Sequence, residues 1–192
     1  MMDMRARMYN RRASGPKSRA EELIKSLELQ SGQAIADIGS GGGYFSFRFA
    51  QIVAKTGKVY AVDTNLGALN YIRRESVARG VSNLATVAAG EVFSGIPPCS
   101  LDMVFLRNVY HHLDDPAEYF AEMRKLLKAE GKVVVIDYRG DRRGFTFYKL
   151  FKHSVTPQQV KEDMVEAGYT FESSFDYLPE QYFMIFKRKN GE

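Results

Sequence analysis

The stretch DIGSGGGYFS, residues 37–46, holds four glycines and lies between two apolar segments. The run before it, QAIA at 33–36, is typical of a short buried strand. The segment after it, at 44–55, has the apolar spacing of a helix that Gly57 ends. A simple strand-to-helix turn needs one or two glycines. Four clustered glycines therefore indicate a backbone that approaches a ligand closely.

Strand-like and helix-like segments alternate along the rest of the chain. The expected strands are 33–38, 58–63, 84–89, 101–106, 132–137, 170–175 and 182–187, and the expected helices are 20–29, 44–55, 65–79, 116–128 and 156–167. Apolar strands with helices between them predict a parallel sheet covered on both faces. Only a short turn joins the last two strands, so one of them must run antiparallel. The sequence thus predicts an α/β fold: a doubly wound, seven-stranded, mostly parallel sheet with an antiparallel C-terminal edge hairpin.

Length and composition bound the class of protein. A chain of 192 residues fits one domain, and its single cysteine, Cys99, excludes an internal disulfide and suits a reducing compartment. No apolar run is long enough to span a membrane, and the N-terminus lacks the apolar core of a secretory signal. We expect a soluble cytoplasmic protein with no membrane partner.

The charge is concentrated at the N-terminus. Six basic residues against Asp3 give residues 1–20 a charge of +5, and the total of +4 leaves −1 for the other 172 residues. Because these 172 residues are slightly acidic, they are not expected to form a surface that binds nucleic acid. We expect residues 1–17 to form a basic, solvated and partly flexible tail, and residues 18–192 to form a single domain.

The glycine spacing restricts the ligand. A dinucleotide-binding turn needs G-x-G-x-x-G, but Tyr44 stands where the third glycine belongs, and the pattern is G-x-G-x-G at Gly39, Gly41 and Gly43. No Lys-Ser or Lys-Thr follows, so the common phosphate loop is excluded too. This spacing disfavours a nicotinamide oxidoreductase and indicates a compact ligand.

Two acidic residues follow the next strands. Asp63 ends VYAVD, where a carboxylate can accept hydrogen bonds from both ribose hydroxyls, and Thr64 and Asn65 remain to cap the following helix. Glu91 lies in VAAGEVF after the third strand. It either accepts from an adenine amino group or is a solvated loop residue.

These motifs resemble those of class I S-adenosylmethionine-dependent methyltransferases, which have a Rossmann-like fold. DIGSGGGYF, VYAVD and AGEVFSGIP match the family's first, second and adenine-side motifs, and LDMVFLRNVYHHLDDP matches its fourth-strand segment. The resemblance covers about residues 18–187, and the chain is similar to the branch of this family that methylates small molecules. It implies the cofactor S-adenosylmethionine.

The resemblance also implies roles for individual residues. The glycines would lie against the methionine part of the cofactor, and Asp37 would help to fix its amino group. Arg107 and Asn108 would line the methyl-donor end. The predicted cofactor-binding set is Asp37, Gly39, Ser40, Gly41, Tyr44, Asp63, Gly90, Glu91, Arg107 and Asn108.

Methyl transfer depends largely on positioning, and a general base helps only when the nucleophile carries a proton. RNVYHHLDD at 107–115 offers His111 as a candidate catalytic base and His112 as a structural imidazole, while Asp114 and Asp115 read as helix-start residues. We predict no metal site, because adjacent histidines rarely converge on one ion.

Other interpretations stay open beside methyl transfer to a small molecule. One is a non-catalytic module that binds S-adenosylmethionine, and another is an RNA methyltransferase that uses the basic tail. A homodimer is also open. The basic and aromatic segment DYRGDRRGFTFYKLFKHS at 137–154 is either a lid over an anionic or planar substrate or an amphipathic helix on the sheet.

Overall fold

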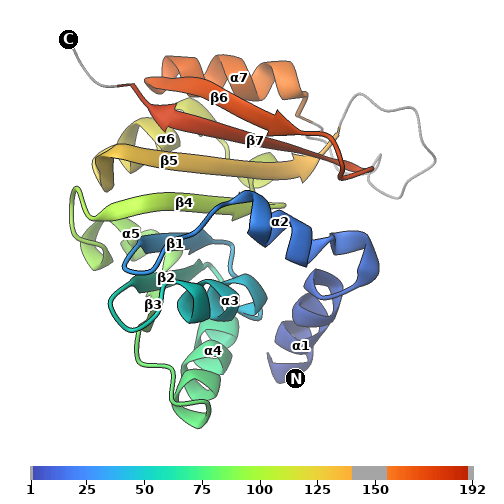
Figure 1. Cartoon of the computed structure of the whole chain (residues 1–192), viewed down its shortest axis with the longest axis vertical. Coiled ribbons are helices and arrows are strands. Elements are labelled where there is room, and N and C mark those ends of the chain that lie inside the picture. The colour runs from blue at the N-terminus through green and yellow to red at the C-terminus, as the bar shows by residue number, and fades with distance from the viewer. Residues whose placement is uncertain (1, 140–154, 190–192) are drawn as a thin grey trace.

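The computed structural model describes residues 2–139 and 155–189 of the chain. Its centre is a seven-stranded sheet in the order β3-β2-β1-β4-β5-β7-β6 (Figure 1). The strands are β1 Ala34–Ile38, β2 Lys58–Asp63, β3 Leu84–Ala88, β4 Leu101–Arg107, β5 Leu127–Tyr138, β6 Tyr169–Phe175 and β7 Gln181–Arg188. Strands β1 to β5 pair in parallel, and β7 runs antiparallel to both β5 and β6. The predicted fold class is confirmed.

Helices occupy the connections between the strands. They are α1 Met2–Ala13, α2 Ala20–Ser26, α3 Tyr44–Ile52, α4 Leu66–Ala78, α5 Val92–Gly95, α6 Pro116–Met123 and α7 Pro157–Glu166, with 3₁₀ turns η1 Pro16–Ser18, η2 Ala89–Glu91 and η3 Tyr110–His112. Three of them begin at a side-chain cap, because Asn65, Asp115 and Thr156 accept backbone N–H groups of the first turn. No helix among the described residues is long and apolar enough to cross a membrane.

The sheet separates two apolar layers. Along β4, Met103 and Phe105 pack with α2 and α3, whereas Val104 and Leu106 pack with the α5, α6 and α7 side. This alternation leaves β4 buried on both faces, as a parallel sheet requires. The core therefore holds the carboxyl ends of β1, β4 and β5 rigidly side by side.

The N-terminal segment differs from the prediction. Residues 2–13 form helix α1, which lies beside α3 and α4 (Figure 1), instead of a solvated tail. Ala6 is fully buried, and Asn10 Nδ2 donates a hydrogen bond of 2.8 Å to the Gly42 carbonyl. The packed face consists of small and polar residues with one partly exposed aromatic residue, Tyr9, so it has no apolar periodicity that sequence analysis could detect. The domain boundary after residue 17 stays a prediction.

Strand β5 begins earlier than expected. The sequence predicts a helix through Lys128, but α6 ends at Met123, and Leu127 already pairs with Leu101 of β4. The ladder shifts register between this pair and the pair of Met103 with Lys132. Tertiary pairing of a buried leucine thus overrides the helix propensity of KLLK.

Candidate active site

The glycine loop follows β1 and crosses the end of β2. The N–H groups of Gly39 and Ser40 donate to the Val62 carbonyl at 2.8 and 3.0 Å. Gly39, Gly41 and Gly43 all have positive φ, at 71°, 54° and 81°. A side chain would be strained in each of these conformations. The loop follows β1, and the strand order reverses between β1 and β4, which is where α/β sheets bind their ligands.

Part of the glycine requirement comes from the protein itself. A Cβ atom on Gly42 would lie 2.2 Å from the Ala6 carbonyl oxygen of α1, and one on Gly39 would lie 2.2 Å from Cγ2 of Val109. The sequence interpretation assigned all of these glycines to a ligand. The structure adds a second reason for glycine at these positions, because α1 and the loop after β4 both pack closely against this backbone.

A buried carboxylate and a buried hydroxyl lie at the start of the loop. Asp37 is 3% exposed and accepts a hydrogen bond of 2.5 Å from Ser46 Oγ. Burial raises the pKa of Asp37 to about 7, against the lowering effect of that hydrogen bond. Within the described part of the chain, Ser40 Oγ is buried and has no hydrogen-bond partner. Both groups are suited to a polar ligand that carries a positive charge.

Asp63 ends β2 and supports the loop. Its Oδ2 accepts the Gly41 N–H at 2.8 Å, and its Oδ1 accepts the Asn65 N–H at 2.8 Å. The side chain of Asn65 caps α4, so the prediction that Asp63 is not needed as the cap is confirmed. Each carboxylate oxygen keeps a second lone pair, and the predicted contact with a ribose stays a prediction.

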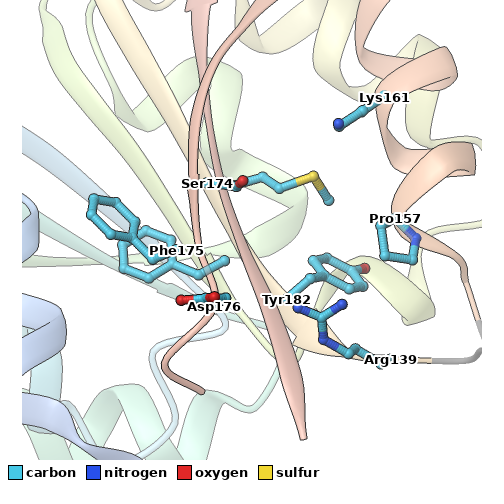
Figure 2. Close-up of a pocket in the computed structure, with 9 residues that line it drawn as sticks. Arg139, Pro157, Lys161, Ser174, Phe175, Asp176 and Tyr182 are labelled. Atoms are coloured by element: carbon cyan, nitrogen blue, oxygen red, sulfur yellow. The ribbon is translucent and has the colours of Figure 1, made fainter. Parts of the chain in front are cut away.

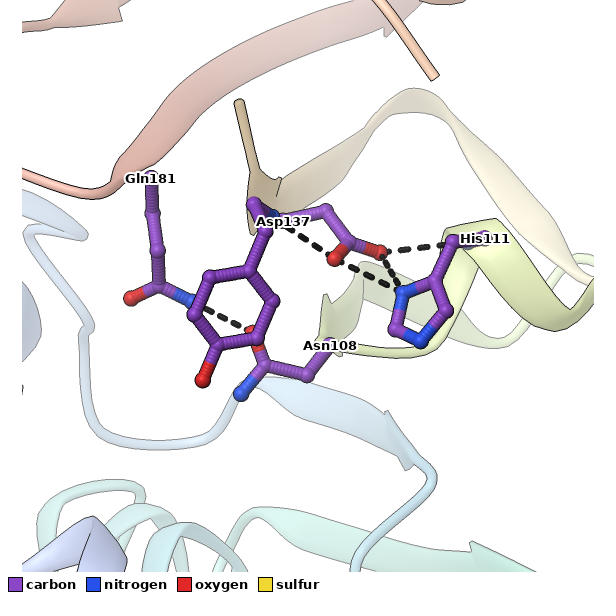
Figure 3. A network of polar contacts seen from close by, with 5 residues as sticks. Asn108, His111, Asp137 and Gln181 are labelled. Atoms are coloured by element: carbon purple, nitrogen blue, oxygen red, sulfur yellow. Dashed lines mark hydrogen bonds and ion pairs between the residues drawn. The ribbon is translucent and has the colours of Figure 1, made fainter. Parts of the chain in front are cut away.

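Arg107 is the last residue of β4 and Asn108 follows it, and both side chains contact distant segments of the chain. Arg107 donates to Ser18 Oγ at 2.7 Å, to the Ser18 carbonyl at 3.0 Å and to Gln181 Oε1 at 2.9 Å. Asn108 has a φ of 59°, and its Oδ1 accepts from Gln181 Nε2 (Figure 3). Arg107 thus joins the first segment of the domain to β7. A cofactor contact by either residue stays a prediction, and sequence reasoning missed Gln181.

His111 is paired with a buried carboxylate. Its Nδ1 lies 2.8 and 2.9 Å from the two carboxylate oxygens of Asp137, and its backbone N–H donates to the same carboxylate at 3.2 Å. Asp137 is 1% exposed, and the His111 side chain is 20% exposed. Figure 3 shows the second ring nitrogen pointing away from Asp137. A carboxylate on Nδ1 fixes the tautomer that leaves Nε2 basic.

Asp137 is the important residue that the sequence interpretation missed. It ends the run KVVVID just as Asp63 ends KVYAVD, and strands β5 and β2 are parallel members of one sheet. This shared pattern was the available signal. His112 follows His111 and is mostly exposed. Partial burial of its ring and the neighbouring imidazole of His111 together lower the pKa of His112.

The other predicted cofactor residues lie near the same edge of the sheet. Tyr44 is the first residue of α3, half-buried, with its ring edge against Phe45 at 5.2 Å between centroids. Gly90 and Glu91 form the exposed turn η2 after β3. Their contacts with a cofactor stay predictions.

A cavity of about 120 Å³ lies between α7 and the β6–β7 hairpin (Figure 2). Arg139, Lys161 and Tyr182 line it, and none of the predicted cofactor residues does. Tyr182 is the β7 partner of Asp137, so the cavity adjoins the His111–Asp137 pair. Of the predicted lid, only residues 137–139 are described, and its arginines at 142 and 143 lie outside the described residues.

Comparison with known families bears on this geometry. A family model described as a methyltransferase domain matches residues 29–184. The chain belongs to this family of class I S-adenosylmethionine-dependent methyltransferases. It is 24% identical over 166 residues to the demethylmenaquinone methyltransferase of Oceanobacillus iheyensis, which covers 84% of this chain and 70% of that protein.

Other relatives agree with this assignment. The chain is 29% identical to the ubiquinone/menaquinone biosynthesis C-methyltransferase UbiE of Cupriavidus metallidurans, over 78% of this chain and 63% of that protein. The chain thus spans from just under half to about two thirds of the length of several curated relatives, for example 47% of one from Cellvibrio japonicus. A crystal structure of an S-adenosylmethionine-dependent methyltransferase from Aquifex aeolicus matches with a TM-score of 0.78 at 20% identity. That match covers 94% of this chain and 97% of the other and shows the shared fold.

The cofactor of this family, S-adenosylmethionine, fits the groups present. Its amino group is a cation suited to the buried Asp37 carboxylate, and the Ser40 hydroxyl lacks a partner within the described residues. Gly39 and Gly41 add no side chain of their own to the loop, and Val109 and Tyr9 occupy the positions that a Cβ atom there would need.

Proposed function

We propose that this chain transfers a methyl group from S-adenosylmethionine to a small-molecule acceptor, and that His111 removes a proton from the acceptor as it reacts. The single observation that carries the proposal is the contact of His111 Nδ1 with the buried carboxylate of Asp137. A buried acid that orients an imidazole is a common arrangement for a general base.

The cofactor would lie across the carboxyl ends of β1, β2 and β4. Asp37 would hold the amino group, Asp63 would accept from the ribose hydroxyls, and Glu91 would face the adenine. The hydrogen bond from Gly41 to Asp63 supports this arrangement, because it fixes the ribose-side carboxylate against the glycine loop. Val109 packs on Gly39, so the segment that carries His111 touches the same loop.

When bound, S-adenosylmethionine would supply an electrophilic methyl group on a positively charged sulfur, with a neutral thioether as the leaving group. His111 Nε2 takes the proton that the acceptor loses, and the imidazole becomes an imidazolium. Asp137 stabilises that charge through Nδ1, as a neighbouring carboxylate stabilises any imidazolium. The backbone N–H of Tyr138 also donates to Asp137 Oδ1 at 2.7 Å and helps to hold the carboxylate in place.

The acceptor class that suits this base is a hydroxylated aromatic compound. Loss of the hydroxyl proton makes both the oxygen and the ring carbons more nucleophilic, so one base serves oxygen or carbon methylation. The demethylmenaquinone methyltransferase among the relatives has an acceptor of related type in its name. Arg139 and Lys161 give the adjoining cavity two positive charges against the one carboxylate of Asp176, which also lines it, and this excess of positive charge favours a phenolate (Figure 2).

The test is turnover with a panel of hydroxylated aromatic compounds, followed by mass spectrometry of the methylated product and of S-adenosylhomocysteine. His111→Gln should reduce kcat by about 10²- to 10⁴-fold, the typical contribution of a general base, with unchanged cofactor affinity. His112→Gln is the matched control, because it removes the exposed neighbouring imidazole, and it should retain activity. Equal loss in both variants would contradict the assignment of the base.

The alternatives predict other results. A non-catalytic module would bind S-adenosylmethionine and give no product with any acceptor. An RNA methyltransferase would methylate RNA in preference to small molecules, and its activity would depend on the arginines of α1. The homodimer and the cytoplasmic location stay predictions from the sequence.

A further inference from the structure

Helix α1 turns one face to the protein and the opposite face to solvent. Ala6 and Asn10 are four residues apart and contact the glycine loop, so they define the inner face. Met4 and Met8 are also four residues apart and are 66% and 41% exposed. They lie on the side of the helix away from Ala6.

Four arginines flank this pair of methionines. Arg7 and Arg11 lie along one side of the methionine stripe, and Arg5 and Arg12 lie along the other, since they follow the helical spacings of three, four and seven residues. All four are exposed, and no ion pair engages them within the described residues. We call the six residues together the outer face of α1: Met4, Arg5, Arg7, Met8, Arg11 and Arg12.

A strip of apolar side chains between two rows of cations is the pattern of a helix that lies in the plane of a membrane surface. The methionines can enter the boundary between headgroups and acyl chains, and the arginines reach lipid phosphates on either side. The arginines alone would suit RNA equally well, but an RNA surface gains nothing from exposed methionines. The only aromatic residue of α1, Tyr9, lies at the edge of the inner face: its ring is close to Gly41 on one side, and its side chain is 40% exposed.

We propose that the outer face of α1 docks this protein on a bilayer surface rich in anionic phospholipids. The distribution of charge along the chain favours an anionic partner. Residues 1–20 carry +5, which an anionic surface attracts, whereas the rest of the chain carries −1, so the protein would orient with α1 toward the membrane. The sequence analysis expected no membrane partner, but contact of this kind needs no helix that crosses the bilayer.

The inner face of α1 gives this docking a consequence for the site. The same helix touches Gly41 and Gly42, so a membrane-bound α1 would bring the cofactor loop close to the lipid surface. The inference goes beyond the proposed function, which requires only that the acceptor be small. It does not depend on turnover, because lipid binding can be measured without any methyl acceptor.

The experiment is flotation of the full chain with vesicles of phosphatidylcholine alone and of phosphatidylcholine mixed with phosphatidylglycerol. We expect binding only to the mixed vesicles, with release in high salt. Arg5→Gln with Arg12→Gln should weaken binding roughly 30-fold, or about fivefold for each arginine lost. The matched control, Lys25→Gln with Lys55→Gln, removes two exposed charges elsewhere and should leave binding nearly unchanged.

A second variant tests the methionine stripe directly. The chain has no tryptophan, so Met8→Trp introduces a single tryptophan on the outer face, whose emission can be excited selectively at a wavelength that tyrosine does not absorb. Its emission should shift to the blue with mixed vesicles and stay unchanged with phosphatidylcholine alone. Equal binding to both vesicle types, equal loss in the lysine control, the absence of a blue shift, or binding to single-stranded RNA without binding to vesicles would each overturn the proposal. Circular dichroism of every variant confirms that it is folded.

Discussion

Strands β2 and β5 have similar sequences near their carboxyl ends, and each carries an aspartate there. The two aspartates have different hydrogen-bond partners. KVYAVD ends at Asp63 and KVVVID ends at Asp137, both at the carboxyl edge of one sheet. Asp63 is half-buried and accepts from the backbone N–H groups of Gly41 and Asn65. Asp137 is almost fully buried and accepts from the ring of His111.

The difference lies in the loops and not in the strands. A parallel strand delivers its last side chain to the ligand edge whatever follows it. Beside β2, a glycine loop offers only backbone donors, which makes Asp63 a support for the loop. Beside β5, the turn after β4 offers an imidazole, which makes Asp137 a support for a base. Under the proposed function, the same strand pattern would therefore serve binding at one place and chemistry at the other.

The largest expected effect is on catalysis at the β5 end. Asp137→Asn should lower kcat by about 10²- to 10⁴-fold, because a neutral amide does not stabilise the imidazolium and can hold the wrong tautomer of His111. Cofactor affinity, measured by calorimetry, should stay within a few-fold of wild type. A collapse of cofactor affinity with little loss of kcat would reverse the comparison.

The next effect is on cofactor affinity at the β2 end. Asp63→Asn weakens the charge-assisted hydrogen bond from Gly41 and the one proposed from the ribose, each worth about 1.5–3 kcal/mol, so the affinity for S-adenosylhomocysteine should fall roughly 10- to 100-fold. At saturating cofactor, kcat should change little. A variant that binds normally but turns over slowly would show that Asp63, like Asp137, acts on the chemistry.

Asp37 sharpens the comparison through pH. Burial raises its pKa from 3.8 to about 7, so the folded protein holds a proton there that the unfolded chain has lost. Its contribution to the free energy of unfolding is complete below about pH 4 and is lost as the pH rises to about 7, by at most about 1.4 kcal/mol per unit.

Denaturation of wild type and Asp37→Asn at several pH values measures this contribution as the difference between the two proteins. That difference should fall with increasing pH across this window and level off above it. Affinity for S-adenosylhomocysteine should rise through about pH 7 in the wild type and not in the variant. A difference that does not change with pH would mean that Asp37 is ionised throughout.

The smallest expected effect concerns Asn65, which caps α4 in place of Asp63. Asn65→Ala removes the side chain that accepts from Gly67 and Ala68 at the start of α4, which should cost about 1 kcal/mol of unfolding free energy. Thermal denaturation measures the loss, and cofactor affinity should hardly change. If the free energy of cofactor binding fell by as much as the free energy of unfolding, the cap and the carboxylate of Asp63 would act as one unit.

Sequence analysis was most successful where structure is local. Apart from the start of β5, the strand patterns, and caps such as Asn65 and Asp115, depend on neighbours within a few residues, and they were predicted correctly. The pairing of His111 with Asp137 spans 26 residues, and no local periodicity indicates it. Helix α1 was missed for a related reason, because its inner face carries small residues that fit the glycine loop and form no apolar stripe.

The contacts of Arg107 also determine when the site can form during folding. They join β4 to Ser18 and Gln181, 89 and 74 residues away along the chain. Contacts of such separation close large loops and tend to form late. On the ribosome, the cofactor edge therefore stays incomplete until β7 has been synthesised and has inserted between β5 and β6. A nascent chain that ends after β5 would have its glycine loop but no Gln181 to brace Arg107.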